Sequence, residues 1–147
     1  MCADNEIGIL CYSPLMQGLL TGKFDSADQV PEGRARTRHF SPERPQAKHG
    51  EANREEETFE AVGRVREIAE EIGEPMADVA LAWLLHRRGV TSVLAGARHP
   101  GQARQNAQAG DLILPDDVMQ RLTEATDPLK ESLGPNPDMW LTNPRIE

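Results

Sequence analysis

Only two stretches of this 147-residue chain have the pattern of a β-strand. Residues 7–11 (IGILC) form an almost continuous apolar run, and residues 90–93 (VTSV) are rich in β-branched side chains. Continuous apolar runs are typical of parallel strands that are covered on both faces. Two such strands can neither cover themselves nor satisfy the hydrogen-bonding groups at their outer edges. The sequence therefore predicts one part of a larger parallel sheet.

Helical patterns lie between and after the strands. Apolar residues at spacings of three and four predict a helix over about residues 59–72. A second helix, apolar nearly all round and therefore buried, is predicted to follow Pro75 and to end at Gly89. Further helices are expected over 100–109 and 114–126. Strand, loop, helices, strand and helix is the order of parallel α/β units, which predicts an α/β fold.

The remaining segments lack periodicity. Residues 12–24 form an irregular loop, and the tail is rich in proline. The long polar segment 25–54 is of a kind that forms functional lids or is disordered. Its Arg34, Arg36 and Arg38 alternate, so in an extended segment they would face one way. This favours a lid that closes on a phosphate or a substrate, although a solvated basic stretch fits equally well.

Composition excludes several classes of protein. The formal net charge of −8 argues against a general nucleic-acid surface or an anionic membrane partner. No apolar run approaches the roughly 20 residues that span a bilayer, and the first residues lack the pattern of a signal peptide. A cytoplasmic protein is therefore expected. Cys2 and Cys11 are too few for a disulfide framework or a metal cage, and Cys11 is expected to be a small buried residue. No metal site is expected.

Residues 90–106 (VTSVLAGARHPGQARQN) indicate an anion site. Gly96 allows a tight turn or a close approach, and a proline in the first helical turn leaves the free amides there pointing outward. Arg98, Gln102 and Asn106 are four residues apart, so they lie on one side of the first helical turns. An ordinary strand-to-helix loop with solvated polar side chains remains the alternative.

Two long motifs resemble the C-terminal half of the aldo/keto reductases. Residues 8–24 (GILCYSPLMQGLLTGKF) are similar to that family's seventh strand and cofactor loop. Residues 76–106 (MADVALAWLLHRRGVTSVLAGARHPGQARQN) are similar to its seventh helix, its eighth strand and the start of its eighth helix, and the resemblance extends into residues 111–122 (DLILPDDVMQRL). It implies the C-terminal portion of a (β/α)8 TIM barrel, incomplete as a barrel, with a site at the C-terminal ends of the strands.

One partial domain, residues 1–147, is implied. It comprises strand 7 and the cofactor loop (7–24), the long loop (25–54), the helices, strand 8 and the cofactor-binding helix (55–109), and the C-terminal helix and tail (110–147). The implied activity is hydride transfer between NADPH and an aldehyde, a ketone or the corresponding alcohol.

The same resemblance implies the cofactor contacts. Tyr12 would stack on the nicotinamide, with an aromatic ring packed on the core as the alternative. The loop around the pyrophosphate would use mainly backbone amides of Ser13, Leu15, Gly18 and Leu20, with added charge from Lys23. The segment beside the ribose 2′-phosphate would comprise Gly96, Ala97 and Arg98. The helix positions that hold phosphate and adenine would be Gln102, Gln105 and Asn106. At all of these positions plain loop residues are the alternative.

Three positions depart from the family's commonest pattern. Some members have a lysine in place of Gly96, an arginine in place of Gln102 and a glutamate in place of Gln105. The weaker positive charge leaves NAD as the alternative to NADP, although Arg98 and an arginine of residues 34–38 could compensate.

No catalytic residue is expected in this chain. The family's catalytic tyrosine, lysine, aspartate and histidine belong to the first half of the barrel, and the one tyrosine here, Tyr12, matches the stacking position. Without a proton donor the chain alone should be inactive. The resemblance thus implies a truncated or mis-started product of an NADP(H)-dependent oxidoreductase, poorly stable because its strands are wetted. The alternatives are a non-catalytic regulatory half barrel that pairs with another chain, and an unrelated α/β phosphate-binding fragment.

Overall fold

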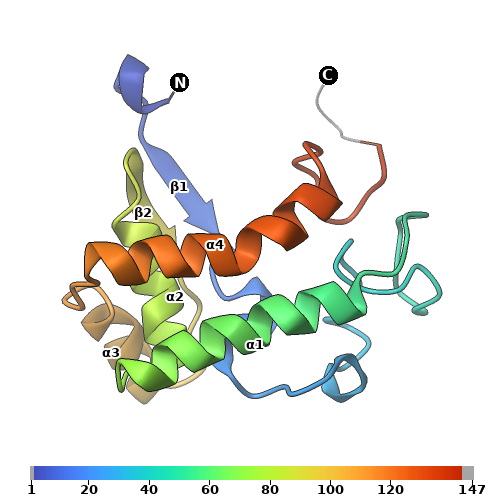
Figure 1. Cartoon of the computed structure of the whole chain (residues 1–147), viewed down its shortest axis with the longest axis horizontal. Coiled ribbons are helices and arrows are strands. Elements are labelled where there is room, and N and C mark those ends of the chain that lie inside the picture. Colours follow the sequence, from blue (N-terminus) through green and yellow to red (C-terminus); the bar gives the residue numbers. More distant parts are fainter. Residues whose placement is uncertain (1, 144–147) are drawn as a thin grey trace. The chain divides into compact units, whose positions relative to one another are not determined.

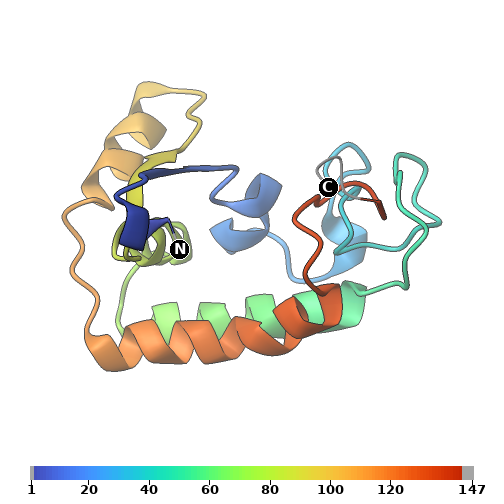
Figure 2. The same cartoon turned by 90° about the horizontal axis from the view of Figure 1, so that it is seen from above.

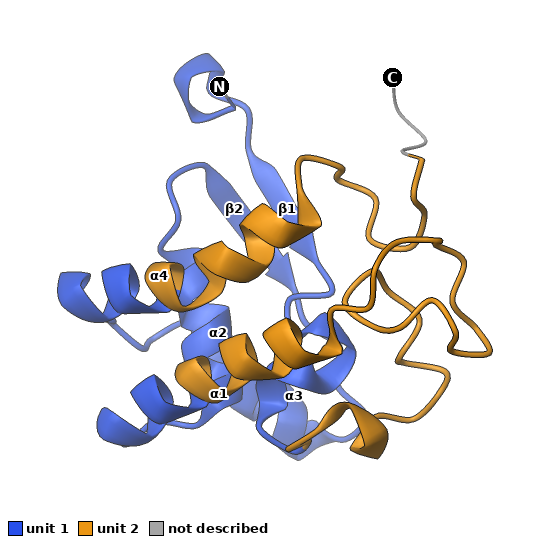
Figure 3. Cartoon of the chain, turned by 45° about the vertical axis from the view of Figure 1, so that its right-hand side comes forward, with its two compact units in different colours: residues 1–23, 66–122 blue, residues 24–65, 123–147 orange. Residues whose placement is uncertain are grey.

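The computed structural model describes residues 2–143 and divides into two compact units (Figure 3). Unit 1 comprises Met1–Lys23 and Arg66–Leu122, and unit 2 comprises Phe24–Val65 and Thr123–Glu147. The elements, in chain order, are η1 (Ala3–Asn5), β1 (Ile9–Tyr12), η2 (Met16–Thr21), η3 (Ala27–Gln29), α1 (Glu55–Glu71), α2 (Met76–Leu85), β2 (Val90–Leu94), α3 (Pro100–Gln108) and α4 (Asp116–Leu133), where η denotes a 3-10 helix (Figure 1). Helices α1 and α4 each contribute residues to both units.

The two predicted strands form the sheet of unit 1, which confirms the α/β class. β1 and β2 pair in parallel, with Ile9 opposite Val90 and Tyr12 opposite Leu94. β1 begins two residues later than predicted and includes Tyr12, because pairing with β2 continues to that residue. Figure 2 shows the short loop that leads from β2 directly into α3. Since the strands are parallel and end opposite each other, the chain leaves both at the same edge.

Helix α2 packs against β2 and is the core helix of unit 1. Its predicted burial is confirmed, because Met76, Val79 and Leu81 are all less than 9% exposed. The indole Nε1 of Trp83 donates a hydrogen bond to the carbonyl oxygen of Met119 at 3.3 Å, which joins α2 to the first turns of α4 within this unit. The sequence predicted this helix correctly because its apolar residues are almost continuous.

The strands are wetted, as the sequence led us to expect. Leu10 is 62% exposed, Tyr12 60% and Leu94 55%, although such runs are usually covered on both faces. Cys11 is half-buried, so the expectation of a buried thiol is wrong. An apolar surface of this kind normally marks a contact with further protein.

The long segment 25–54 of unit 2 is folded by turns and is not extended. The backbone N–H of Arg34 donates to Pro31 at 2.8 Å and that of Phe40 to Thr37 at 2.9 Å. The predicted alternation of Arg34, Arg36 and Arg38 along an extended segment is therefore wrong. Val30, Ala35 and Phe40 are buried, which explains why the segment is ordered despite its polar composition. The sequence could not show this, because isolated apolar residues without periodicity give no pattern.

Two helix ends differ from the predictions. α1 begins at Glu55, where three glutamates in the first turn are favoured by the helix dipole. α4 continues to Leu133 and contains Pro128, although a proline inside a helix removes a backbone hydrogen bond and usually ends it. Residues 144–147 of the predicted tail lie outside the described range. Among residues 2–143, no helix is both long and apolar enough to cross a membrane.

The difference in burial between Leu81 of α2 and Leu10 of β1 predicts that their substitution has different effects on stability. Leu81→Ala removes a side chain that is 2% exposed and should lower the free energy of unfolding by about 2–5 kcal/mol. Leu10→Gln alters a side chain that is 62% exposed and should change it by less than about 0.5 kcal/mol. Urea unfolding followed by circular dichroism measures both. Equal losses would mean that the outer face of β1 is covered in solution.

Two glycines should also differ in their tolerance of a side chain. A Cβ at Gly8 would overlap Oγ1 of Thr91 and lie 3.2 Å from its Cβ, whereas nothing lies within 4 Å of a Cβ at Gly96. Gly8→Ala should therefore destabilise the chain by about 1–3 kcal/mol through crowding of the sheet. Gly96→Ala should be neutral or stabilising by up to about 1 kcal/mol. The same urea experiment tests both substitutions, and an equal cost at the two positions would contradict the strand pairing.

Candidate functional site

Two loops of unit 1 begin at the same sheet edge. Tyr12 and Leu94 are opposite each other at the ends of β1 and β2, so the loops that follow start from neighbouring positions. The first loop contains residues 13–23 and the second residues 95–99. The parallel pairing thus brings together the starts of two segments that are far apart in the sequence, and both were predicted to bind one ligand.

Tyr12 marks this edge with an exposed aromatic ring. Its side chain belongs to the last residue of β1, and the residue is 60% exposed. The alternative interpretation, a ring packed on the core, is therefore wrong. An aromatic ring on an accessible strand end can present a flat apolar face to a ligand.

The first loop has an unusual backbone. Ser13, Met16 and Gln17 have φ angles of 52°, 48° and 57°, in the left-handed region that non-glycine residues rarely adopt, and Gly18 follows with a φ of 102°. Such conformations cost free energy and cluster at functional sites. The sequence around Gly18 indicated a turn, but nothing in it predicted left-handed residues at three other positions.

Hydrogen bonds within the first loop engage some of the amides predicted to hold phosphate. The N–H groups of Gly18 and Leu20 both donate to the carbonyl oxygen of Leu15, at 2.8 and 3.3 Å. The hydroxyl of Thr21 donates to the carbonyl oxygen of Gly18 at 2.7 Å. At Gly18 and Leu20 the amides therefore stabilise the loop itself, while Lys23 lies exposed at its end.

The second loop is braced by the first turns of α3. Oε1 of Gln102 accepts a hydrogen bond from the backbone N–H of Arg98 at 2.8 Å, and Nδ2 of Asn106 donates to the carbonyl oxygen of Gly96 at 3.2 Å. Gln102 and Asn106 both contact the backbone of this loop, but Arg98 precedes α3, so the predicted placement of all three residues on the first helical turns is wrong. Ala97 and the Arg98 side chain remain exposed beside them.

His99 caps α3 and was missed by the sequence reasoning. Its Nδ1 accepts a hydrogen bond from the backbone N–H of Gln102 at 3.3 Å. The position before a proline at the start of a helix is the N-cap, so the spacing could have identified it, but histidine is not a preferred cap residue. Pro100 begins the helix as predicted.

Gln105 contacts a different element from the one that Gln102 and Asn106 contact. Its Nε2 donates to Oδ1 of Asp78 on α2 at 3.2 Å. Burial and the nearby charge of Glu74 raise the pKa of Asp78, and the hydrogen bond from Gln105 opposes this. Asp78, which sequence reasoning did not single out, therefore contacts a residue predicted to bind the ligand.

The surroundings of Gly96 do not require a glycine for the reasons predicted from the sequence. Its φ is not left-handed, and no atom of the described chain lies within 4 Å of the place where a Cβ would stand. Neither a tight turn nor a close approach by the described part of the protein requires glycine here. The residue instead leaves open space in the loop next to Arg98.

Arg38 is not a phosphate ligand in this structure. It belongs to unit 2, is 4% exposed, and its guanidinium is bound to Glu51 and to main-chain carbonyl oxygens. A buried and fully engaged guanidinium cannot close on a ligand without breaking these bonds. Arg36 is exposed and Arg34 half-buried. Over residues 2–143, no cluster of three or more histidine, cysteine, aspartate or glutamate side chains could hold a metal ion.

Several known proteins are similar in sequence to this chain over most of its length. An L-glyceraldehyde 3-phosphate reductase of Escherichia coli O157:H7 is 36% identical over 72% of this chain and 29% of its own. A putative voltage-gated potassium channel subunit beta of Schizosaccharomyces pombe is 31% identical over 80% of this chain and 33% of its own. The NADH-specific methylglyoxal reductase of Escherichia coli K12 is 29% identical over 86% of this chain and 37% of its own. The chain thus spans about a third of the length of the curated relatives that it matches.

The fold has a counterpart among solved structures. A glycerol dehydrogenase from Gluconobacter oxydans matches 92% of this chain and 38% of its own, with a TM-score of 0.65 and 24% identity. The family model described as the aldo/keto reductase family matches residues 1–127, which include both motifs and both loops. This chain belongs to the aldo/keto reductase family.

Proposed function

We propose that this chain is the C-terminal, dinucleotide-binding part of an aldo/keto reductase that reduces aldehydes or ketones, or oxidises the corresponding alcohols, with NADP(H). The observation that carries the proposal is the register of the sheet, with Tyr12 opposite Leu94. It places the starts of the two loops side by side at the carboxyl ends of parallel strands, where barrels of this kind build their sites.

The chemistry of the two loops suits a dinucleotide. The exposed ring of Tyr12 offers a face for the nicotinamide, and the exposed Arg98 offers a planar fork for a phosphate. Helix α3, of nine residues, begins directly after the second loop, and the positive end of its dipole favours a negative charge there. The open space at Gly96 lies in the same loop as Arg98. When bound, the nicotinamide would supply or accept the hydride, while the chain orients it.

The choice between NADP and NAD rests on Arg98. Gln102 and Asn106 are committed to the loop backbone, so Arg98 carries the exposed positive charge next to Gly96. A 2′-phosphate would gain two parallel hydrogen bonds from its guanidinium. Among the relatives, one from Schizosaccharomyces pombe is named for NADP(+) and one from Escherichia coli for NADH. We propose NADP as the preferred cofactor.

This part of the enzyme would not supply the proton. Tyr12 is the single tyrosine, and the role proposed for it is stacking. A general acid must lie within hydrogen-bond reach of the substrate. We therefore propose that the proton donor and its supporting residues come from the part of the barrel that the relatives have and this sequence does not cover.

A second candidate function follows from the exposed strands. Leu10, Tyr12 and Leu94 give the parallel pair an exposed apolar surface. One relative from a fungus and one from a plant are named as voltage-gated potassium channel beta subunits. A non-catalytic module that completes its barrel with another chain would have this surface. Size-exclusion chromatography with light scattering distinguishes it, because such a module forms a discrete complex, whereas a stable cofactor-free monomer would contradict it.

Cofactor binding should depend on Arg98 and discriminate between the two dinucleotides. Arg98→Ala is expected to weaken NADPH binding about tenfold, the loss for charge-assisted hydrogen bonds at an exposed position. NADH binding should change less, because it has no 2′-phosphate. The measurement is a titration followed by reduced-nicotinamide fluorescence, with circular dichroism to confirm folding.

The matched control is Arg104→Ala, which removes an exposed arginine of α3 that is not among the proposed ligand contacts. It should leave both affinities unchanged. A folded chain that binds inorganic pyrophosphate as tightly as NADPH would contradict the dinucleotide proposal, and equal effects of the two arginine variants would show that only general charge matters.

A further inference from the structure

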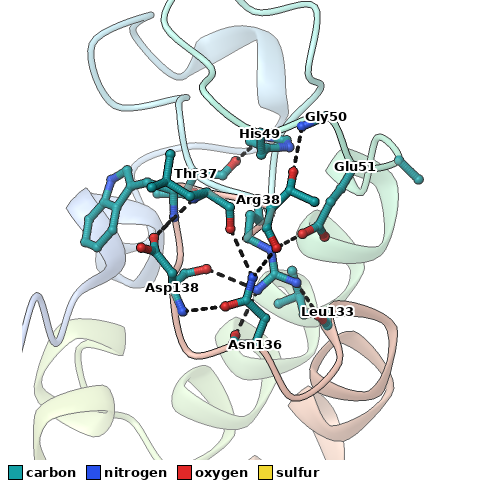
Figure 4. A network of polar contacts seen from close by, with 12 residues as sticks. Thr37, Arg38, His49, Gly50, Glu51, Leu133, Asn136 and Asp138 are labelled. Atoms are coloured by element: carbon teal, nitrogen blue, oxygen red, sulfur yellow. Dashed lines mark hydrogen bonds and ion pairs between the residues drawn. The ribbon is translucent and has the colours of Figure 1, made fainter. Parts of the chain in front are cut away.

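Arg38 holds the tail of the chain to the long loop within unit 2 (Figure 4). Its Nη1 donates to the carbonyl oxygens of Asn136 and Asp138 at 2.9 and 3.2 Å, and its Nη2 to that of Leu133. Its Nε forms an ion pair with Glu51 at 2.6 Å. One buried guanidinium thus satisfies carbonyl groups at and beyond the end of α4, which have no helical partner.

The tail is attached at other points as well. The backbone N–H of Arg38 donates to the carbonyl oxygen of Met139 at 2.8 Å, and that of Gly50 donates to Oγ1 of Thr142 at 2.9 Å. Nδ2 of Asn136 donates to the carbonyl oxygen of Thr142 at 2.8 Å, which closes the tail into a loop. We call residues 37–51 together with the tail segment 133–142 the tail clasp.

Two buried histidines lie inside the tail clasp. Nε2 of His49 is 3.1 Å from the carbonyl oxygen of Thr37, and a carbonyl oxygen can only accept, so Nε2 carries the hydrogen. In the neutral ring Nδ1 is then an acceptor, and it is buried without a hydrogen-bond partner among residues 2–143. Nδ1 of His39 is 3.2 Å from the hydroxyl of Thr37. His39 is 8% exposed and His49 6%.

The surroundings of both rings favour their neutral form. Burial, then the charges of Arg38, Arg54 and His49, lower the pKa of His39 to about 4. Burial also lowers the pKa of His49, assisted by the two arginines and opposed by the Thr37 carbonyl and by Glu51. Nearby, Arg54 pairs with Glu51 at 3.0 Å, and Arg44 pairs with Glu55 at 2.8 Å. A proton on either histidine would therefore add a positive charge near the guanidinium groups of Arg38 and Arg54.

We propose that the tail clasp is an acid-sensitive switch, in which protonation of His39 and His49 releases the tail segment 133–142 from the loop 37–51. A proton on Nδ1 of His49 would bury a donor that has no acceptor among the described residues and a charge close to two guanidinium groups. His49 is hydrogen-bonded to the carbonyl group of Thr37, and the hydroxyl of Thr37 contacts His39. Thr37 and His39 are the chain neighbours of Arg38. A movement that brings water to the two rings therefore disturbs the contacts of Arg38.

The direction of the pH dependence follows from linkage. Each histidine has a lower pKa in the closed state than in the open state, so the open state binds its proton more tightly. Above the open-state pKa the histidine is neutral in both states, and its contribution to the stability of the closed state is complete. This contribution is lost as the pH falls towards the closed-state pKa. For His39 the window runs from pH 6.5 down to about 4, and the opening equilibrium rises roughly 300-fold in total from well above this window to well below it. At pH 5 the rise is about 30-fold. The residues of the switch belong to unit 2, whereas those of the proposed dinucleotide site belong to unit 1.

Fluorine NMR of the whole chain labelled with 5-fluorotryptophan tests the proposal. Trp140 lies in the tail clasp and Trp83 lies on α2 in unit 1, so Trp140→Phe assigns the two resonances. Between pH 7.5 and 4 the Trp140 resonance should shift to a second position, and Trp83 should not follow it. His39→Gln combined with His49→Gln should move this transition below pH 4, because glutamine keeps a donor but does not titrate.

The control is His86→Gln, an exposed histidine in unit 1, which should leave the Trp140 transition unchanged. A transition that persists in the double variant would overturn the proposal and assign acid sensitivity to carboxylates such as Glu51. A joint shift of both tryptophans, or no shift of Trp140, would overturn it as well.

Histidine titration of the unmutated chain gives a second test if the double variant does not fold. In NMR spectra of the chain with labelled histidine, His39 and His49 should titrate below pH 6.5 and together with the Trp140 resonance. Titration of both near pH 6.5 would contradict the proposal.

Discussion

The parallel pairing of β1 with β2 is the interaction on which the rest of unit 1 depends. Residues 13–89 separate these two short strands, and their register sets where the two loops that follow them begin. With Tyr12 opposite Leu94, an aromatic ring, a loop with left-handed residues and a braced loop before α3 all start from one edge. Parallel strands require long crossover connections, which explains why two helices and the first segment of unit 2, Phe24–Val65, lie between them in the sequence.

The polar residues of the candidate site have two separate tasks. Gln102 and Asn106 hold the main chain of the second loop, whereas Arg98 and Tyr12 present exposed groups. A loop whose shape is fixed before a ligand arrives loses less conformational entropy on binding. The residues that brace the loop therefore contribute to the proposed site through its shape, and those that are exposed contribute through direct contact.

In unit 2 the polar contacts are centred on a buried cation, the guanidinium of Arg38. Arg38 is stable in the interior because Glu51 and three carbonyl oxygens surround it, and a buried charge without such partners would be strongly unfavourable. The same low-dielectric surroundings keep His39 and His49 neutral. The arginine that the sequence suggested as a ligand for phosphate is instead the residue that fixes the tail.

The sequence by itself determined the helices, the two strands, their parallel α/β order and the family, because these follow from periodicity and from long contiguous motifs. It also indicated Gln102 and Asn106 as a pair, since residues four apart share a helix face, whereas Arg98, which was grouped with them, precedes the helix. Only the tertiary structure decided that Gln105 turns to Asp78, that Gly96 faces open space and that Arg38 is buried. These outcomes depend on which distant groups meet, and a side chain's direction and burial are set by those neighbours and not by local spacing.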